Sequence, residues 1–253
     1  MHSAQKSMLS KWLATEQGRY VLDWELQQFD LAVEDVFGFK AAQSGLPDID
    51  FLRSNRIPHR FTFAPEHGAA LHADPQQLPL ANASVDLLAL PHVLEFSADP
   101  HRVLREAERV LMPEGQVVIS GFNPLSLWGA RHSLMRDARR RDAACPWNAH
   151  FIGLLRLKDW LKLLGFELNG GMFGCYAPPF AQAKWLARFA FIEKAGARWW
   201  PITGGLYVVR AIKRVHAMRV VMPAWPRERA KSSVLSPVAN SNGHARTRTG
   251  TDG

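Results

Sequence analysis

The sequence predicts an α/β protein with a doubly wound, mostly parallel sheet, and three consecutive patterns within residues 72–120 predict it. The run from Ala83 to Leu94 is almost wholly apolar, as is typical of a strand that helices cover on both faces. An amphipathic helical pattern follows, and the β-branched run Val117 to Ile119 then indicates another buried strand. A strand, a helix and a strand in this order form a right-handed crossover, and we expect the first strand to be central.

The residues also define where the crossover helix starts and stops. Asp99 can cap it, and Pro100 suits its first turn, where a missing amide hydrogen costs nothing. Pro113 and Gly115 mark its end. We expect the helix to lie on the sheet, because its apolar residues recur on one face with the helical period: Val103, Leu104, Ala107, Val110 and Leu111.

Five further strands are predicted on both sides of this unit, which brings the total to seven. A helical stripe ended by Gly165 precedes the fourth of them. In chain order the five are a strand that ends before Gly45, His59 to Ala64, His72 to Asp74, Phe166 to Phe173 and Gly204 to Lys213.

Three motifs in this region resemble the type 11, class I S-adenosylmethionine-dependent methyltransferases. They are Asp-Pro-Gln-Gln-Leu-Pro-Leu at 74–80, Ser-Val-Asp-Leu-Leu-Ala-Leu-Pro-His-Val-Leu-Glu at 84–95 and Leu-Arg-Glu-Ala-Glu-Arg-Val-Leu-Met-Pro-Glu-Gly at 104–115. The run 120–129 resembles a bacterial subgroup of that family with a degenerate first motif. The resemblance extends over about Phe37 to Arg214. It implies a Rossmann-like, seven-stranded sheet with an antiparallel last strand, and S-adenosyl-L-methionine as cofactor.

The resemblance also implies which residues bind the cofactor. Asp74 ends the third strand, where the family's acid binds the adenine amino group, and Leu90 in the fourth strand belongs to the same pocket. Glu66 follows the second strand and can replace the acid that binds the ribose. The family has a glycine-rich loop after its first strand, and of that loop only Gly45 is present. From the residues alone, Asp74 could instead cap a turn with Pro75.

His92 is the candidate catalytic residue. It lies just past the fourth strand with Glu95, at the edge where open α/β sheets place their ligands. A methyl transfer needs alignment of acceptor, methyl group and leaving sulfur, and it needs a base only if the acceptor must lose a proton. His92 is either that base or a structural hydrogen-bonding residue.

The sequence therefore supports two functions. The first is an S-adenosylmethionine-dependent methyltransferase acting on a small-molecule acceptor, which the sequence does not identify. The alternative is a catalytically degenerate, methyltransferase-like binding or scaffold protein, because the glycine-rich loop is lost. No metal site is expected, since Cys145 and Cys175 have no paired ligand spacing.

Three parts of the chain are expected: an N-terminal helical segment at 1–36, a methyltransferase-like domain at 37–214 with an insertion at about 176–202, and a disordered basic tail at 223–253. Within the first part, two helical segments should be broken near Gly18. The aromatic and basic insertion could be a lid, a membrane-surface or partner-binding helix, or a helix packed on its own sheet.

The chain carries a formal net charge of +8, most of it in 131–142 and in the tail. No nucleic-acid-binding signature accompanies these segments, so we expect no specific nucleic-acid partner. No apolar run is long enough to cross a bilayer, which favours a soluble cytoplasmic protein, and a peripheral membrane contact stays open. The sequence does not specify the oligomeric state.

Overall fold

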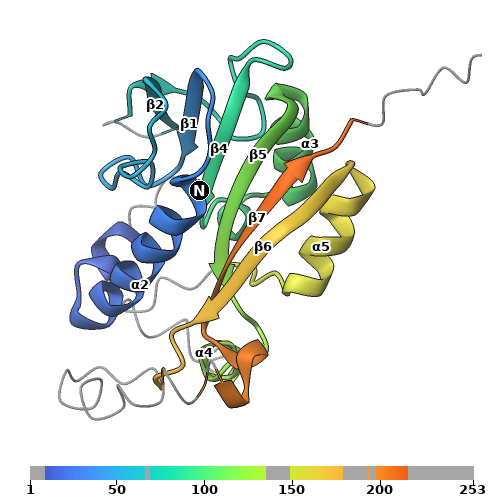
Figure 1. Ribbon diagram of the computed structural model, residues 1–253. Helices are drawn as coiled ribbons and strands as arrows, with labels where there is room; N and C mark the ends of the chain where they lie inside the picture. The colour runs from blue at the N-terminus through green and yellow to red at the C-terminus, as the bar shows by residue number, and fades with distance from the viewer. Residues whose placement is uncertain are drawn as a thin grey trace, which may run out of the picture. The chain divides into compact units, whose positions relative to one another are not determined.

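A computed structural model describes residues 9–65, 69–134, 149–178, 193, 196 and 198–215 of the chain (Figure 1). These residues belong to the unit Met1–His216. Glu66, most of the predicted insertion at 176–202 and the predicted tail at 223–253 lie outside the described residues.

The described residues form one sheet of seven strands, as predicted, and the strand order is β3-β2-β1-β4-β5-β7-β6 (Figure 1). Strands β1 to β5 pair in parallel, whereas β7 is antiparallel to both of its neighbours, β5 and β6. The predicted central strand, β4, has three strands on either side. The strands are β1 Lys40–Ser44, β2 His59–Ala64, β3 Leu71–His72, β4 Val85–Pro91, β5 Leu111–Phe122, β6 Phe166–Gly174 and β7 Leu206–Lys213.

Helix α3, Pro100–Val110, begins as predicted, because the Asp99 carboxylate accepts a hydrogen bond of 3.0 Å from the Arg102 amide. Its end differs from the prediction. The chain becomes extended at Leu111, which pairs with Val85 of β4, so β5 starts before Pro113. Pairing of Leu111 in the sheet thus takes precedence over the turn that Pro113 and Gly115 suggest, and the register of β4 and β5 shifts between Val85 and Leu87.

Helices cover both faces of the sheet. Helices α3 and α5, Leu154–Leu163, pack on one face through apolar residues such as Leu104 and Leu157. Helix α2, Glu16–Val33, packs on the other face through Val21, Phe29 and Val33. Three shorter elements complete the described part: η1 Leu94–Phe96, α4 Leu127–Leu134 and η3 Pro201–Thr203.

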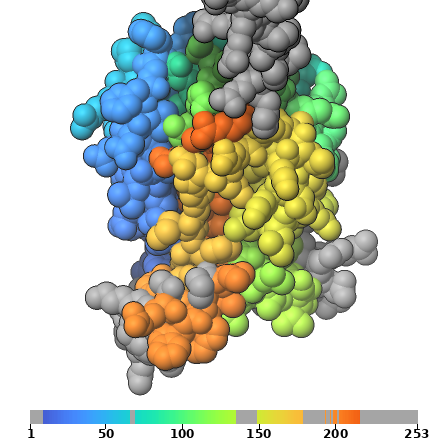
Figure 2. Space-filling model, turned by 45° about the vertical axis from the view of Figure 1, so that its right-hand side comes forward, coloured from blue at the N-terminus to red at the C-terminus, as the bar shows by residue number. Residues whose placement is uncertain are grey.

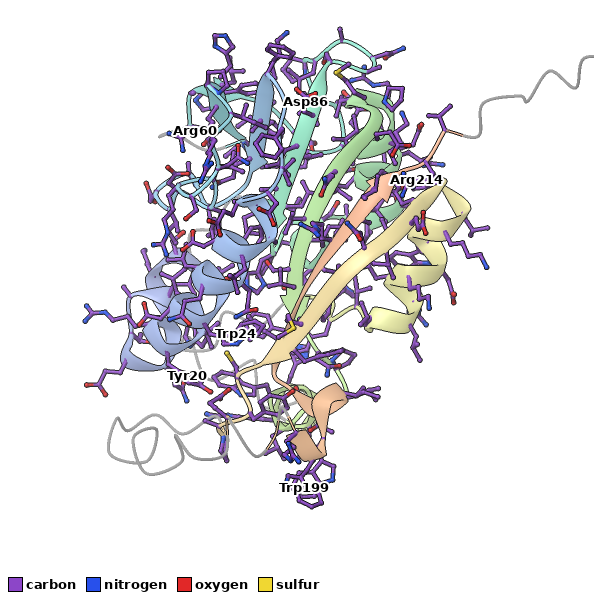
Figure 3. All side chains as sticks on the ribbon, viewed as in Figure 1. Tyr20, Trp24, Arg60, Asp86, Trp199 and Arg214 are labelled. Carbon is purple, nitrogen blue, oxygen red and sulfur yellow. The ribbon has the colours of Figure 1, made fainter. Side chains whose placement is uncertain are left out.

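The connection between β1 and β2 contains no helix. Residues 45–58, all of them described, form turns, and Phe51, Leu52 and Ile57 pack from these turns into the α2 side of the core. At the start of β1, the Asp86 carboxylate of β4 accepts hydrogen bonds from the amides of Phe39 and Lys40, at 2.8 and 2.9 Å (Figure 3). The first crossover of this sheet is therefore made of turns alone.

The break between the two N-terminal helical segments is at Thr15 rather than at Gly18. Residues 9–13 are helical, and Thr15 caps α2, with its hydroxyl accepting a hydrogen bond of 3.2 Å from the Gly18 amide. Gly18 lies inside α2, at a position where only a glycine fits. A methyl group on it would lie 2.1 Å from the Trp12 carbonyl oxygen.

The substitution Gly18→Ala is expected to destabilise the protein by about 1–3 kcal/mol, the usual cost of overpacking. Alanine favours a helix by about 1 kcal/mol over glycine, but its methyl group would meet rigid backbone atoms of Trp12 and Leu13. Urea denaturation measures the effect. Gly170→Ala is the matched control, since a methyl group there meets nothing within 4 Å. Equal stabilities of the two variants would contradict the close approach at Gly18.

Candidate functional site

The carboxyl ends of β1, β4 and β5 bring polar side chains together. Strand β1 ends at Ser44 and is followed by Gly45. His92 and Glu95 follow β4, and Ser120 lies near the end of β5. Because these strands are parallel neighbours, their carboxyl ends meet at one edge of the sheet, which is where open α/β sheets bind ligands. We call this edge the candidate site.

An ion cluster of Glu25, His92 and Glu95 lies at the centre of the candidate site. The Nδ1 atom of His92 is 2.8 Å from Glu95 Oε2, and its Nε2 atom is 3.4 Å from Glu25 Oε2. Glu25 comes from α2, so the helix that covers this face supplies one member of the cluster. The three residues are each at most 1% exposed.

Further contacts fix the carboxylates of this cluster. The Ser120 hydroxyl donates to Glu25, and the Phe122 amide donates to Glu95. The His92 amide donates to the Ser120 hydroxyl at 3.3 Å, and the ring of Phe122 lies 4.7 Å from the His92 ring. His92 itself has a φ of +53°, a left-handed conformation that few residues other than glycine adopt.

The electrostatics of the cluster favour a positively charged His92. Burial alone would lower the pKa of His92, but the Glu25 and Glu95 carboxylates outweigh burial and raise it to about 10. Burial also raises the pKa of Glu95, against the opposing effect of His92. At neutral pH both ring nitrogens carry protons that face carboxylates. In this arrangement His92 has no nitrogen to accept a proton from an acceptor, and the structural alternative fits the geometry.

The loop after β1 is organised by Gln43, which is 1% exposed. Its amide nitrogen donates to the carbonyl oxygens of Gly45, Leu46 and Ile49, at 3.2, 3.2 and 2.7 Å, and its oxygen accepts from the Phe51 amide at 2.9 Å. The amide is required here because three carbonyl oxygens need a donor, which a carboxylate is not.

Gly45 has the positive φ of +83° that a glycine allows. A methyl group on it would lie 3.2 Å from the Val93 side chain, which follows β4. The loop after β1 therefore packs closely on the segment after β4. Leu90, which was also predicted for the cofactor pocket, is 1% exposed. It belongs to the hydrophobic core between the sheet and the helices α3 and α5.

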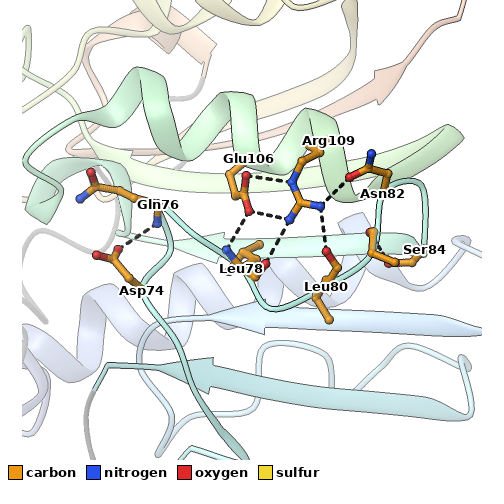
Figure 4. A network of polar contacts seen from close by, with 9 residues as sticks. Asp74, Gln76, Leu78, Leu80, Asn82, Ser84, Glu106 and Arg109 are labelled. Atoms are coloured by element: carbon orange, nitrogen blue, oxygen red, sulfur yellow. Dashed lines mark hydrogen bonds and ion pairs between the residues drawn. The ribbon is translucent and has the colours of Figure 1, made fainter.

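Asp74 ends the third strand region in an exposed turn. Its Oδ1 atom accepts a hydrogen bond of 2.9 Å from the Gln76 amide, so it does cap a turn, as the alternative interpretation held (Figure 4). Because the carboxylate is exposed, a ligand can also reach it. Glu66, the candidate for the ribose, lies outside the described residues.

The loop that carries Asp74 is anchored to α3 by two residues that the sequence placed only on the polar face of that helix. Glu106 accepts from the Leu78 amide at 2.8 Å, and Arg109 donates to the Leu78 and Leu80 carbonyl oxygens at 3.0 and 2.8 Å (Figure 4). Glu106 and Arg109 also pair with each other at 2.6 Å. The signal for this role is a Glu and an Arg three residues apart on one helix.

The described residues contain no group of three or more metal-ligating side chains that could hold an ion. In the same part of the chain no helix is long and apolar enough to span a membrane.

Comparison with known proteins defines the class of this fold. Residues 52–119 match the family model Methyltransf_11, a methyltransferase domain. Over these residues the chain is therefore similar to a methyltransferase domain, and its seven-stranded sheet has a fold that solved methyltransferases also have. A methyltransferase of Thermotoga maritima, described as a possible histamine N-methyltransferase, has a similar fold, with a TM-score of 0.53 and 18% identity over 78% of this chain and 97% of that one.

Two relatives match part of the sequence more strongly. The Escherichia coli (strain K12) protein YafS is 48% identical over 98 residues, which are 39% of this chain and 39% of YafS. A demethylmenaquinone methyltransferase of Chlamydia pneumoniae is 44% identical over 77 residues, which are 30% of this chain and 33% of that protein. The chain thus spans only about a third to two fifths of these curated relatives.

The Thermotoga maritima protein of similar fold is described as an S-adenosylmethionine-dependent methyltransferase. The exposed Asp74 carboxylate after β3 can accept a hydrogen bond from an amino group such as that of adenine. The loop after β1 fits the methionine end of S-adenosylmethionine less closely, because it contains one glycine, Gly45, and the Val93 side chain fills the space beside it. The buried Ser44 hydroxyl at the end of β1 has no hydrogen-bond partner among the described residues.

Proposed function

We propose that this protein is an S-adenosylmethionine-dependent methyltransferase that acts on a small-molecule acceptor in the cytoplasm. The observation that supports the proposal is the exposed Asp74 carboxylate, which lies after β3 in a loop that Glu106 and Arg109 of α3 anchor through Leu78. The proposed catalytic domain is 37–214. S-adenosylmethionine would supply an electrophilic methyl group, and the protein would supply position.

The residues would divide the work in the following way. Asp74 would accept from the adenine amino group, Leu90 would line the pocket, and the backbone around Gly45 would approach the methionine end. Glu66 is proposed for the ribose. His92 would serve as a base only in a state in which α2 has withdrawn Glu25 from it, because the cluster otherwise keeps it protonated.

A second candidate function is a binding protein that has lost catalysis. The observation that favours it is the loop after β1, where Gln43 takes up the loop carbonyl oxygens and Gly45 packs against Val93. Such a loop presents less backbone to a cofactor than a glycine-rich loop does. The two candidates differ in whether the folded protein binds S-adenosylmethionine.

Calorimetric titration with S-adenosylmethionine and S-adenosylhomocysteine tests the proposal. Asp74→Ala is expected to weaken binding by roughly 10-fold to 100-fold, the effect of losing a hydrogen bond to a charged group. Asp74→Ser is the matched variant, because a serine hydroxyl can still cap the turn but is too short to replace the carboxylate toward a ligand.

The outcomes separate the two candidates. Binding by the native protein that both variants weaken supports the methyltransferase. Native affinity in Asp74→Ser would assign Asp74 to the turn alone and remove it from the pocket. A folded native protein that binds neither compound would favour the second candidate.

A further inference from the structure

Six large apolar side chains lie exposed on two short segments that the candidate site does not use. We call them the aromatic patch: Leu125, Leu127, Leu134, Trp199, Trp200 and Ile202, each between 57% and 84% exposed. The two segments, residues 125–134 in light green and 199–202 in orange, adjoin at one end of the space-filling view (Figure 2). The side chain of Trp199 points away from the ribbon (Figure 3).

The backbone beneath the aromatic patch is held in place. The Asn123 amide group donates to the carbonyl oxygens of Ile202 and Gly204, at 2.7 and 2.9 Å, which joins the two segments. The Thr203 hydroxyl and amide both donate to the Trp200 carbonyl oxygen at 3.0 Å. Behind them, Trp128 is buried and its ring nitrogen donates to the Ala177 carbonyl oxygen at 2.9 Å. The exposed side chains therefore project from a backbone that hydrogen bonds fix.

The two sequence segments that form the aromatic patch contain basic residues and no acidic ones. Residues 124–134 and 198–205 contain Arg131, His132 and Arg198 but no aspartate or glutamate. The sequence that follows Leu134, 135–142, adds four arginines against two aspartates. An apolar patch bordered by cations matches an anionic surface with an apolar layer beneath it.

We propose that the aromatic patch docks the protein on an anionic phospholipid membrane surface. Tryptophan has an apolar ring and a polar N–H group, and it favours the boundary between headgroups and acyl chains. The leucines and the isoleucine add apolar area that can be buried there, and the arginines can contact lipid phosphates. A protein partner would need an apolar surface with acidic residues at the same place. An anionic bilayer combines negative headgroups with an apolar interior everywhere on its surface, so it matches the aromatic patch without a specific complementary shape.

Co-sedimentation of the full chain with phosphatidylcholine vesicles, with and without phosphatidylserine, tests this surface. The double variant Trp199→Ser/Trp200→Ser keeps the net charge and is expected to lower the partition coefficient at least 10-fold. The matched control Leu155→Ser/Leu163→Ser removes two apolar residues of α5 that are 75% and 84% exposed, and it should bind as the native protein does. Thermal unfolding checks that each variant is folded.

Vesicles with brominated acyl chains distinguish two modes of binding. Bromine quenches tryptophans that insert among the acyl chains, whereas basic residues outside the patch that bind only to the headgroups would leave the fluorescence unchanged. Quenching of tryptophan fluorescence in the native protein, lost in the tryptophan double variant, would support the proposal. Binding without quenching, equal binding of the double variant, or no binding to anionic vesicles would overturn it. It would also be overturned if the double variant abolished a dimer in light scattering while its vesicle binding stayed native.

Discussion

The substitution His92→Asn is expected to lower the free energy of unfolding by about 3–5 kcal/mol, the usual cost of removing one partner from a buried ion pair. It would leave the Glu25 and Glu95 carboxylates buried without their cation. Asparagine tolerates the left-handed conformation at this position better than most residues, so backbone strain does not obscure the result. Urea denaturation at neutral pH measures the effect.

The matched control neutralises the whole cluster. The triple variant Glu25→Gln/His92→Asn/Glu95→Gln buries no charge and is expected to recover part of the stability that His92→Asn loses. A loss below about 1 kcal/mol for His92→Asn would show that the cluster is not buried as described.

The same cluster predicts a pH dependence. The pKa of His92 is raised from 6.5 to about 10, and that of Glu95 is also raised, so the folded protein holds protons that the unfolded chain releases. The contribution of His92 to stability is therefore fully present below about pH 6.5 and is lost as the pH rises toward 10. The slope is at most about 1.4 kcal/mol per pH unit for one proton. The triple variant Glu25→Gln/His92→Asn/Glu95→Gln has no titratable group left in the cluster and should remove this slope.

The second large effect is expected from Gln43→Glu, which replaces the buried amide of β1 by a carboxyl group. A carboxylate cannot donate, so it would face the carbonyl oxygens of Gly45, Leu46 and Ile49 without a hydrogen. We expect a loss of about 3 kcal/mol or more in the free energy of unfolding at neutral pH. Denaturant unfolding measures it.

Acidification provides an internal check on Gln43→Glu. A protonated glutamate can donate one hydrogen bond, so this variant should recover stability relative to the native protein as the pH falls. Gln27→Glu, an exposed site on α2, is the matched control and should change stability by less than about 0.5 kcal/mol. A Gln43→Glu protein as stable as this control would mean that Gln43 does not hold the loop.

The strands were predictable because their signals are local. An apolar run such as Val85 to Leu90 is typical of a strand buried on both faces, which predicted its central position, and the resemblance implied the antiparallel last strand. The start of β5 was not predictable from Pro113 and Gly115, because the partner strand decides whether Leu111 is extended. Local turn signals do not contain that information.

The candidate site was predictable only in part, since His92 and Glu95 lie close in sequence whereas Glu25 lies far from both. Glu25 did leave a signal: with Val21, Phe29 and Val33 it recurs every four residues, which puts a carboxylate on the buried face of α2. Gln43 left a similar one, as a polar residue in a buried strand. Both patterns indicate a buried polar group, but its partner appears only when the chain is folded.

The position of β7 has a consequence for biosynthesis. It is the last of the described strands along the chain, yet it lies between β5 and β6, and β6 has no other partner in the described sheet. While the ribosome is still making residues 206–213, β6 can have only unpaired edges, and β5 exposes the edge that β7 will cover. Until β7 has been made, the open edges of β5 and β6 could pair with strands of other nascent chains on the same messenger RNA. The protein must avoid this intermolecular pairing during synthesis.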